Sequence, residues 1–368
     1  MFKADDGPKK GARAWAPTPG EIMIGLVAVT GAVALAILAP GQSADVQPKI
    51  HGTPRFYGVN LPSATFGKKH QVGIYGKDYA YPKRAEAEPF RAMGMNTIRL
   101  GFTWERMQHE ALGPLDADEL KHLDAAIEAL SSFQTIIIDL HNYGSFSGTK
   151  LDDPAKGAML ADLWTKLARH YASNPKIAFG IMNEPHDIDA AVWRKISDQS
   201  LAAIRATGAR NLVLVPGSRW TGGHSWNAGG DGSNAVAMSG FRDSAGNFMF
   251  EIHQYLDSDS SGTKADCTDP VAGSRRLQKV TKWLREQHAK AVLAEFGAPP
   301  TPVCMQALDD LLGYLDKNSD VWAGWTYWAG GSRWKNYPMS IQPENGQPKP
   351  QSEILSRHIA GYSRSASR

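Results

Sequence analysis

The sequence predicts one large α/β domain folded as a (β/α)8 barrel of the TIM type, preceded by an N-terminal hydrophobic export or anchor segment. From residue 56 onward, eight short apolar runs alternate with longer segments whose apolar residues recur at helical spacing. The runs are apolar along nearly their whole length, as expected of parallel strands that are covered on both faces. A doubly wound open sheet is the alternative, but its Gly-x-Gly-x-x-Gly turn should follow the first run, which reads GVNLPS instead.

The expected strands share β-branched or aromatic residues and end at polar or turn-forming ones. They cover residues 56–61, 96–102, 135–142, 177–185, 211–217, 249–256, 290–298 and 321–330. The expected helices have apolar residues three or four positions apart, as Leu160, Leu163 and Leu167 do. They cover residues 85–94, 117–133, 156–172, 189–208, 274–288, 305–318 and 352–362. Only the fifth strand lacks a helix, because residues 218–235 are rich in Gly, Ser and Asn and predict a long loop.

The first 44 residues differ in kind from the rest of the chain. Basic residues precede an uncharged apolar stretch that starts at Ile22 and ends at Ala39. This pattern is typical of an export signal, and about 18 residues at 1.5 Å each is also just enough to span a bilayer. We therefore expect residues 1–44 to be a cytoplasmic basic flank with a cleaved signal peptide or an uncleaved anchor. Residues 45–54 would be a short linker, and residues 55–368 a secreted or periplasmic catalytic domain.

The composition excludes several function classes. The chain has 368 residues, a net charge of +3 and interspersed acids and bases, so nothing resembles a nucleic-acid-binding surface. The two cysteines, Cys267 and Cys304, are most simply a disulfide in an exported protein, with two separate buried thiols as the alternative. Their spacing lacks the short Cys-x-x-Cys pairs of a zinc site, and we expect no metal and no cofactor.

Polar and aromatic residues gather where the apolar runs finish. In a (β/α)8 barrel these strand ends meet at one mouth, where catalytic side chains lie. In chain order they are Arg99, Trp104, His141, Asn142, Asn183, Glu184, Trp220, His253, Tyr255, Glu295, Trp325 and Trp328.

Two of these residues are glutamates in matching positions. Glu184, in GIMNEPHD, and Glu295, in VLAEFGAP, follow the fourth and seventh runs and would face each other across the mouth. Glycosidic-bond hydrolysis needs such a pair, since one carboxyl protonates the leaving oxygen while the other attacks or activates water. Serine hydrolysis fits less well, because GHSWN fails the Gly-x-Ser-x-Gly pattern at its last position. A metal-dependent hydrolase would show paired histidines, whereas His141 and His253 stand singly.

Seven sequence motifs occur in order at the expected strands: GVNL, NTIRLGFTWER, IIIDLHNYG, GIMNEPH, EIHQYLDSDSSGT, LAEFGAP and GWTYWAGG. Together they resemble glycoside hydrolase family 5, particularly its cellulase-like endoglucanases, over residues 55 to 360. The resemblance implies a (β/α)8 barrel that works with retention of anomeric configuration. It also implies that Glu184 is the acid/base and Glu295 the nucleophile.

The resemblance implies roles for the neighbouring residues as well. Arg99 and Tyr255 would favour the ionised form of Glu295, while partial burial and the charge of Glu295 would favour a protonated Glu184. Asn183 would hydrogen-bond the sugar 2-hydroxyl. The remaining implied roles are a subsite lined by His141 and His253, an aromatic platform at Trp328, and a rim fastened by Cys267 with Cys304.

Some residues keep more than one interpretation. Asp139 is expected to be a satisfied core acid and Glu105 a structural partner, whereas Trp220, Trp226 and Trp334 either extend the glycan cleft or pack in the core. The substrate expected is β-1,4-glucan cut internally by a monomer, with Trp220 among the binding residues. The alternatives are the same mechanism on mannan, xyloglucan or mixed-linkage glucan, or a barrel that binds glycans without cutting them.

Overall fold

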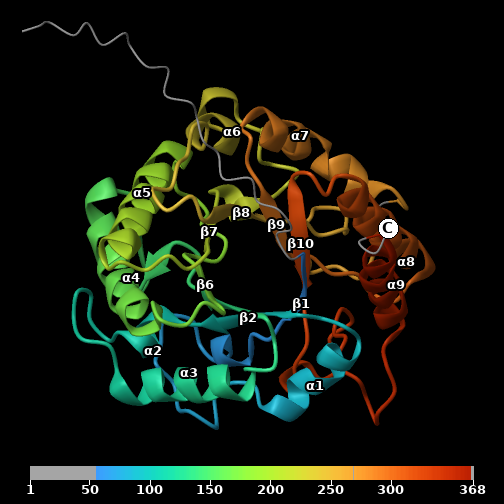
Figure 1. Ribbon diagram of the computed structural model, residues 1–368, viewed down its shortest axis with the longest axis horizontal. Coiled ribbons are helices and arrows are strands. Elements are labelled where there is room, and N and C mark those ends of the chain that lie inside the picture. Colours follow the sequence, from blue (N-terminus) through green and yellow to red (C-terminus); the bar gives the residue numbers. More distant parts are fainter. Residues whose placement is uncertain (1–54, 268, 366–368) are drawn as a thin grey trace, which may run out of the picture. The chain divides into compact units, whose positions relative to one another are not determined.

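The computed structural model describes residues 55–267 and 269–365, with side chains as far as Ile359. Eight parallel strands close into a barrel surrounded by helices, which confirms the predicted fold class (Figure 1). The predicted apolar segment from Ile22 to Ala39 lies outside the described residues. Within the described part of the chain, no helix is both long and apolar enough to cross a bilayer.

The barrel strands follow the apolar runs of the sequence. They are β1 (Phe56–Asn60), β2 (Thr97–Phe102), β3 (Thr135–Leu140), β6 (Ile177–Gly180), β7 (Val213–Pro216), β8 (Phe248–His253), β9 (Ala291–Glu295) and β10 (Trp322–Tyr327). Each pairs in parallel with its neighbours in chain order, and β10 closes the barrel against β1. A small antiparallel hairpin of β4 (Ser145–Phe146) and β5 (Thr149–Lys150) lies after β3.

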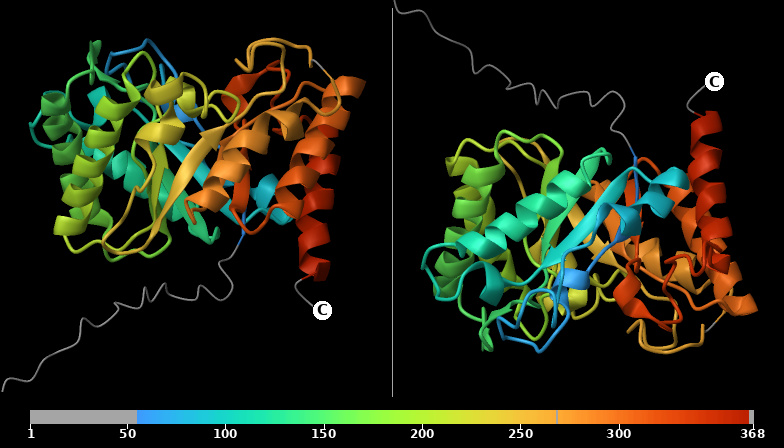
Figure 2. Two further views of the ribbon diagram at one scale, coloured as in Figure 1. Left: turned by 90° about the horizontal axis from the view of Figure 1, so that it is seen from above. Right: turned by 90° about the horizontal axis from the view of Figure 1, so that it is seen from below.

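Helices connect successive strands on the outside of the barrel (Figures 1 and 2). They are α1 (Arg84–Ala92), α2 (Trp104–Met107), α3 (Ala117–Ala129), α4 (Gly157–Tyr171), α5 (Ala190–Ala206), α6 (Asn234–Ala237), α7 (Ala272–Glu286), α8 (Pro302–Lys317) and α9 (Pro350–Ser365). As the loop composition predicts, β7 is followed by a long irregular segment, in which α6 is a single turn. Figure 2 shows the loops after β1 and β8 at the same end of the barrel, as parallel strands require.

Two apolar clusters hold these layers together. A small cluster, which includes Ile137, Leu214 and Val292, fills the inside of the barrel, and a much larger one lies between the strands and the helices. Alternate residues of each strand thus face inward and outward, so both faces are buried. This explains why the strand sequences are apolar along their whole length. A polar side chain on the inner face is therefore an exception that needs a buried polar partner.

The structure differs from the sequence-based expectation in two local details. Strand β6 ends at Gly180, so Asn183 and Glu184 lie in the loop that follows and not in the strand itself. Arg99 is the third residue of the six-residue strand β2 and lies inside the barrel, deeper than the strand-end position expected. The interior can hold this guanidinium because acidic and amide groups from several other strands surround it.

The predicted disulfide is present. Cys267 and Cys304 are bonded and join the loop after β8 to the first turn of α8. The bond encloses a separation of 37 residues, which corresponds to about 3–4 kcal/mol of stabilisation through reduced freedom of the unfolded chain. It therefore fastens the loop that also carries Tyr255, two residues beyond the end of β8.

Candidate active site

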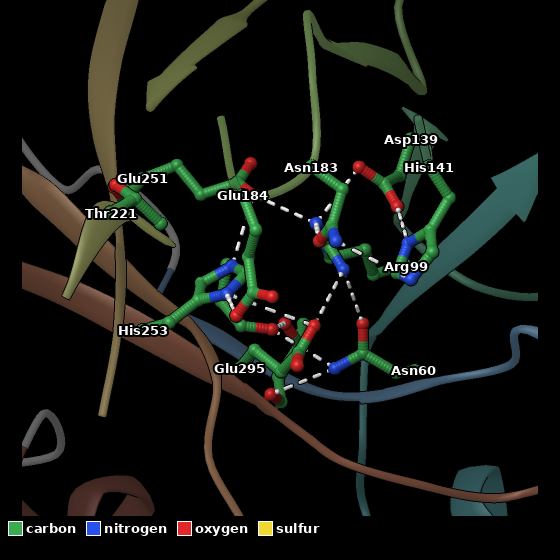
Figure 3. Close-up of polar contacts among 12 residues, drawn as sticks. Asn60, Arg99, Asp139, His141, Asn183, Glu184, Thr221, Glu251, His253 and Glu295 are labelled. Carbon is green, nitrogen blue, oxygen red and sulfur yellow. Dashed lines mark hydrogen bonds and ion pairs between the residues drawn. The ribbon is translucent and has the colours of Figure 1, made fainter. Parts of the chain in front are cut away.

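The predicted site residues His141, Asn183, Glu184, His253 and Glu295 point toward one another, with Arg99 among them (Figure 3). Glu295 is the last residue of β9 and His253 the last of β8, while Asn183 and Glu184 follow β6. All of these side chains are buried except that of Glu184, which is 15% exposed. The sequence therefore brings both glutamates to one mouth, as predicted.

Arg99 is the centre of the buried polar network. Its Nη2 donates to Asp139 Oδ1 at 2.8 Å, to Asn183 Oδ1 at 2.8 Å and to Glu251 Oε1 at 2.7 Å. Its Nη1 donates to Asn60 Oδ1 at 2.9 Å and lies 3.4 Å from Glu295 Oε2.

Burial alone would lower the pKa of Arg99, but the charges of Asp139, Glu251 and Glu295 hold that pKa above its ordinary value. The guanidinium is thus a fixed cation that orients groups from β1, β3, β8, β9 and the loop after β6.

Glu184 is held in a specific backbone conformation. Its φ angle is +42°, in the left-handed region, where the conformation of a non-glycine residue costs about 1–3 kcal/mol. Both neighbours are fixed, since Asn183 N donates to Leu140 O at 2.7 Å and Pro185 O accepts from Trp220 N at 3.0 Å. The surrounding chain therefore imposes the conformation that presents the carboxylate to the mouth.

Glu295 faces Glu184 across a short gap. Tyr255 OH donates to Glu295 Oε1 at 2.6 Å, and Arg99 approaches the other carboxylate oxygen. A carboxylate oxygen of each glutamate and a ring nitrogen of His253 all lie within 4.8 Å of one another. Both expected supports of Glu295, Arg99 and Tyr255, thus contact it directly.

His253 lies between the acidic groups. Its Nδ1 donates to Glu184 Oε1 at 2.9 Å and is 3.8 Å from Glu295 Oε2, while its Nε2 donates to Glu251 Oε1 at 3.1 Å. Burial would lower the pKa of His253, but these carboxylates raise it to about 10. At neutral pH the ring is therefore a cation shared by both glutamates, whereas the resemblance implied only that it lines the subsite.

The electrostatic balance at Glu295 differs from the expectation. Burial raises the pKa of this carboxyl above its ordinary value, and the charge of Glu184 adds to the effect. The cations His253 and Arg99 act in the opposite direction without cancelling the shift. Burial and the negative charge of Glu295 also raise the pKa of Tyr255, so its hydroxyl stays protonated and remains a donor.

His141 and Trp328 form the opposite side of the mouth. Asp139 Oδ2 accepts from His141 Nδ1 at 2.8 Å, which leaves Nε2 near Asn183 Nδ2 at 3.4 Å and Tyr143 OH at 3.1 Å. The Trp328 ring stacks on His141 with centroids 5.6 Å apart and planes 11° apart. Asp139 is buried and bonded to both Arg99 and His141, so it is the satisfied core acid that was expected.

The structure distinguishes the three tryptophans, Trp220, Trp226 and Trp334, that could either extend the cleft or pack in the core. Trp226 is fully buried against Phe250 and Trp283, and it therefore packs in the core. Trp220 is 49% exposed and stacks on His186 near the loop that carries Glu184. Trp334 lies edge-on to Trp328 and lines a cavity beside the mouth, and the His186 ring that stacks on Trp220 lines the same cavity.

A family model described as cellulase, glycosyl hydrolase family 5, matches residues 55–331. The chain belongs to glycosyl hydrolase family 5. Its enzyme class, glycoside hydrolase, is thereby confirmed.

Similar proteins agree with this membership. The family 5 enzyme is 34% identical to endo-beta-1,4-glucanase A of Emericella nidulans over 334 residues, which are 89% of this chain and 96% of that protein. It is 44% identical to an endo-beta-1,4-glucanase from Xanthomonas axonopodis pv. citri, solved with a triple mutation, with a TM-score of 0.79 and coverage of 83% and 99%. It is 45% identical to XacCel5A, solved in complex with cellopentaose, with a TM-score of 0.80 and the same coverage.

Three functional contacts in this family 5 enzyme escaped the sequence reasoning. They involve Asn60, Glu251 and Tyr143, which contact Arg99, His253 and His141 respectively. Glu251 could have been found, because it precedes His253 by two residues in the same strand and so shares its inward face. Glu105 was correctly expected to be structural, since it is buried and accepts from Asn142 Nδ2 at 2.8 Å.

One group of side chains in the described residues has the spacing of a metal site, namely Glu184, His253 and Glu295. A metal ligand must be a deprotonated histidine, however, and the raised pKa of His253 keeps its proton in place at neutral pH. The donor set therefore fits a proton-transfer site better than a cation site.

Proposed function

We propose that this family 5 enzyme is an exported endo-β-1,4-glucanase that cleaves β-glucan by a retaining, two-carboxylate mechanism. The observation that carries the proposal is the close approach of Glu184 and Glu295, whose nearest oxygens lie within 4.8 Å. Retaining glycosidases keep their two carboxyl groups about 5–5.5 Å apart, whereas inverting enzymes need about 6.5–9.5 Å to admit a water. Similarity to the endo-beta-1,4-glucanases described above supports the substrate.

In the first step a Glu295 oxygen attacks the anomeric carbon, the glycosidic C–O bond breaks, and the departing sugar oxygen takes the proton of Glu184. The product is a glycosyl ester of Glu295. Tyr255 and Arg99 orient the attacking carboxylate, and Asn183 is positioned to hydrogen-bond the sugar 2-hydroxyl. The Trp328 ring offers an apolar surface to the sugar at the cleaved bond.

In the second step water attacks the same carbon from the side that the first sugar left. Glu184 takes the proton of this water, and the ester bond to Glu295 breaks. Formation of the ester has removed the negative charge of Glu295, so the carboxylate of Glu184 acts as the base with no second carboxylate opposite it. His253 stays protonated near both carboxyl groups and offsets whichever negative charge is present.

The test is an assay of residues 45–368 on hydroxyethylcellulose, galactomannan, xylan and xyloglucan, with release of reducing ends and loss of viscosity as readouts. We expect cleavage of the cellulose derivative with rapid loss of viscosity, which Glu295→Gln abolishes. The matched control Glu286→Gln alters an exposed acid on α7 and should leave the activity intact. Activity on only another polysaccharide would overturn the substrate. Folded protein that binds glycans without cleaving any of them would overturn the enzymatic proposal.

Export is the second part of the proposal. The basic flank and apolar stretch of residues 1–44 support it, and the Cys267–Cys304 disulfide suits an oxidising compartment. Expression of the whole chain in a bacterial host, followed by fractionation and mass measurement, distinguishes the cases. A shortened soluble product indicates a cleaved signal and a full-length membrane-bound product indicates an anchor, whereas a full-length cytosolic product contradicts export.

A further inference from the structure

A cavity of about 450 Å³ lies beside the catalytic mouth, and of its lining residues only Trp328 takes part in the mechanism above. It starts at His141, Tyr143 and Trp328 and extends between the loop after β1 and the β4–β5 hairpin. Sugars that continue beyond the cleaved bond can enter it, because its inner end shares Trp328 and His141 with the site. Its chemistry therefore bears on which chains the enzyme accepts.

Cationic side chains dominate this cavity. Lys68, Lys69, Arg106 and Lys150 line it, and the acid among its lining residues is Glu105. The Glu105 carboxylate is buried and occupied, since it contacts His70 at 3.1 Å and accepts from Asn142 and from Ser147 N. Its carboxylate oxygens are thus already engaged by groups of the protein, whereas the lysines beside it are not neutralised by it.

The four cations have different partners. Lys150 forms an ion pair with Asp187 at 2.7 Å. Arg106 donates to backbone carbonyls, including that of Val72 at 2.7 Å. These acceptors are neutral, so they satisfy its hydrogen bonds without neutralising its charge. Lys68 and Lys69 are exposed and form no ion pair with any described residue.

Lys69 is placed next to the path of the substrate. Its Nζ lies 5.1 Å from the centre of the Tyr143 ring, and Tyr143 OH in turn contacts His141. An ammonium over an aromatic face is held in position at little cost and keeps its remaining N–H groups available. It can therefore donate to a group on a sugar bound in the cavity.

The charge at the point of cleavage has the opposite sign. The acids there, Asp139, Glu184, Glu251 and Glu295, surround two cations, Arg99 and the protonated His253. An acidic substituent on the sugar being cleaved would meet repulsion, whereas one on a sugar in the cavity would meet Lys68 and Lys69.

We propose that this cavity binds an acidic substituent, a carboxylate or phosphate group, carried by a β-glucan chain on a sugar beyond the cleaved bond. Lys68 and Lys69 are the specificity-determining residues. This inference rests on the proposed glucanase function and adds the class of chain that the enzyme prefers. The ammonium groups recognise charge without a fixed geometry, so either anion satisfies them.

The test compares kcat/KM on carboxymethylcellulose, which is acidic, and on hydroxyethylcellulose, which is neutral. The wild type is measured beside Lys68→Gln/Lys69→Gln and a matched control, Lys279→Gln/Lys282→Gln, which removes two exposed lysines from α7. Because exposed ionic contacts are weak, the ratio of acidic to neutral substrate should fall roughly threefold in the cavity variant. The control should keep the wild-type ratio.

High salt should lower the same ratio in the wild type and have less effect on the cavity variant, because exposed ionic contacts are screened. A phosphorylated cellulose of matched substitution distinguishes the two anions, and a preference for either supports the proposal. An unchanged ratio in the cavity variant, with hydroxyethylcellulose still cleaved, overturns it. If the wild type cleaves neither polymer, the glucanase proposal fails instead.

Discussion

The buried network at the mouth and the cavity beside it are built in opposite ways. In the network, Glu295, Glu251 and Asp139 all contact Arg99, and these side chains are almost wholly inaccessible. In the cavity, Lys68 and Lys69 are exposed and lie on a loop. The strands and the fixed loop after β6 thus hold the groups that handle the proton and the bond, while the exposed loop after β1 carries the groups that select the chain.

The largest effect expected in this comparison comes from Glu184→Gln. Without the proton donor, hydrolysis of β-glucan should slow by about 10²–10⁴-fold. Cleavage of a dinitrophenyl cellobioside should keep a fast initial burst, since this leaving group departs without a proton, and only the second step should be slow. Stopped-flow absorbance measures the burst, and its disappearance would contradict the assignment of Glu184 as acid.

The next effect concerns Glu251, the buried acid between Arg99 and His253. Glu251→Gln removes one partner of a buried ion pair, and it should cost about 3 kcal/mol of unfolding free energy. The kcat value should also fall, because His253 loses part of what holds its charge. Glu286→Gln on the surface should change the unfolding free energy by no more than about 0.5 kcal/mol and should leave kcat nearly unchanged.

The same variant has a pH signature. The pKa of His253 is about 10 in the folded protein against an ordinary value of 6.5, so its contribution to stability is complete below pH 6.5 and is lost as pH rises through 10. The variant should lose less unfolding free energy than the wild type over this window, because its His253 pKa is lower. Urea denaturation at pH 6.5, 8 and 9.5 measures the difference, and parallel curves would show that Glu251 does not support this charge.

A smaller effect should come from the loop that packs on Tyr255. Gly262 has φ +70°, and a Cβ there would lie 2.6 Å from the ring of Tyr255, whose hydroxyl donates to Glu295. Gly262→Ala should therefore disturb this hydrogen bond and lower kcat about tenfold, equivalent to about 1.4 kcal/mol.

Gly246→Ala is the matched control, since it has φ +63° and open space around it. Both variants should lose stability through backbone strain, Gly262→Ala by more because its Cβ also meets the Tyr255 ring, and only Gly262→Ala should lose kcat. Equal kcat values in the two variants would show that the loop does not position Tyr255.

The smallest effect is expected at the rim. Trp220→Ala should raise KM about threefold with little change in kcat or in unfolding free energy, because it removes a half-exposed ring at the rim that is available to stack on a sugar. Trp226 belongs to the same segment but is buried, so Trp226→Ala should cost about 3–5 kcal/mol of stability. A fall in kcat for Trp220→Ala would instead show that this residue affects the catalytic step and not only substrate binding.

The contrast between network and rim also explains what the sequence could predict. Apolar runs that end in a carboxylate located Glu184 and Glu295, because strand periodicity and barrel closure fix where such ends meet. The sequence could not separate Trp220 from Trp226, since the segment after β7 has no repeating pattern. Nor could it foresee the sign of the Glu295 pKa shift, which depends on burial and on the distances to several charges, or the cavity beside Lys69, which depends on how two loops meet.

The most direct test of the central assignment is to trap the covalent intermediate. Incubation with a 2-deoxy-2-fluoro cellobiosyl fluoride, followed by peptide mapping by mass spectrometry, identifies the residue that attacks the sugar. The account predicts one glycosyl group per chain, attached to Glu295. Attachment to any other residue, or turnover that releases the inverted anomer with no attachment, would contradict it.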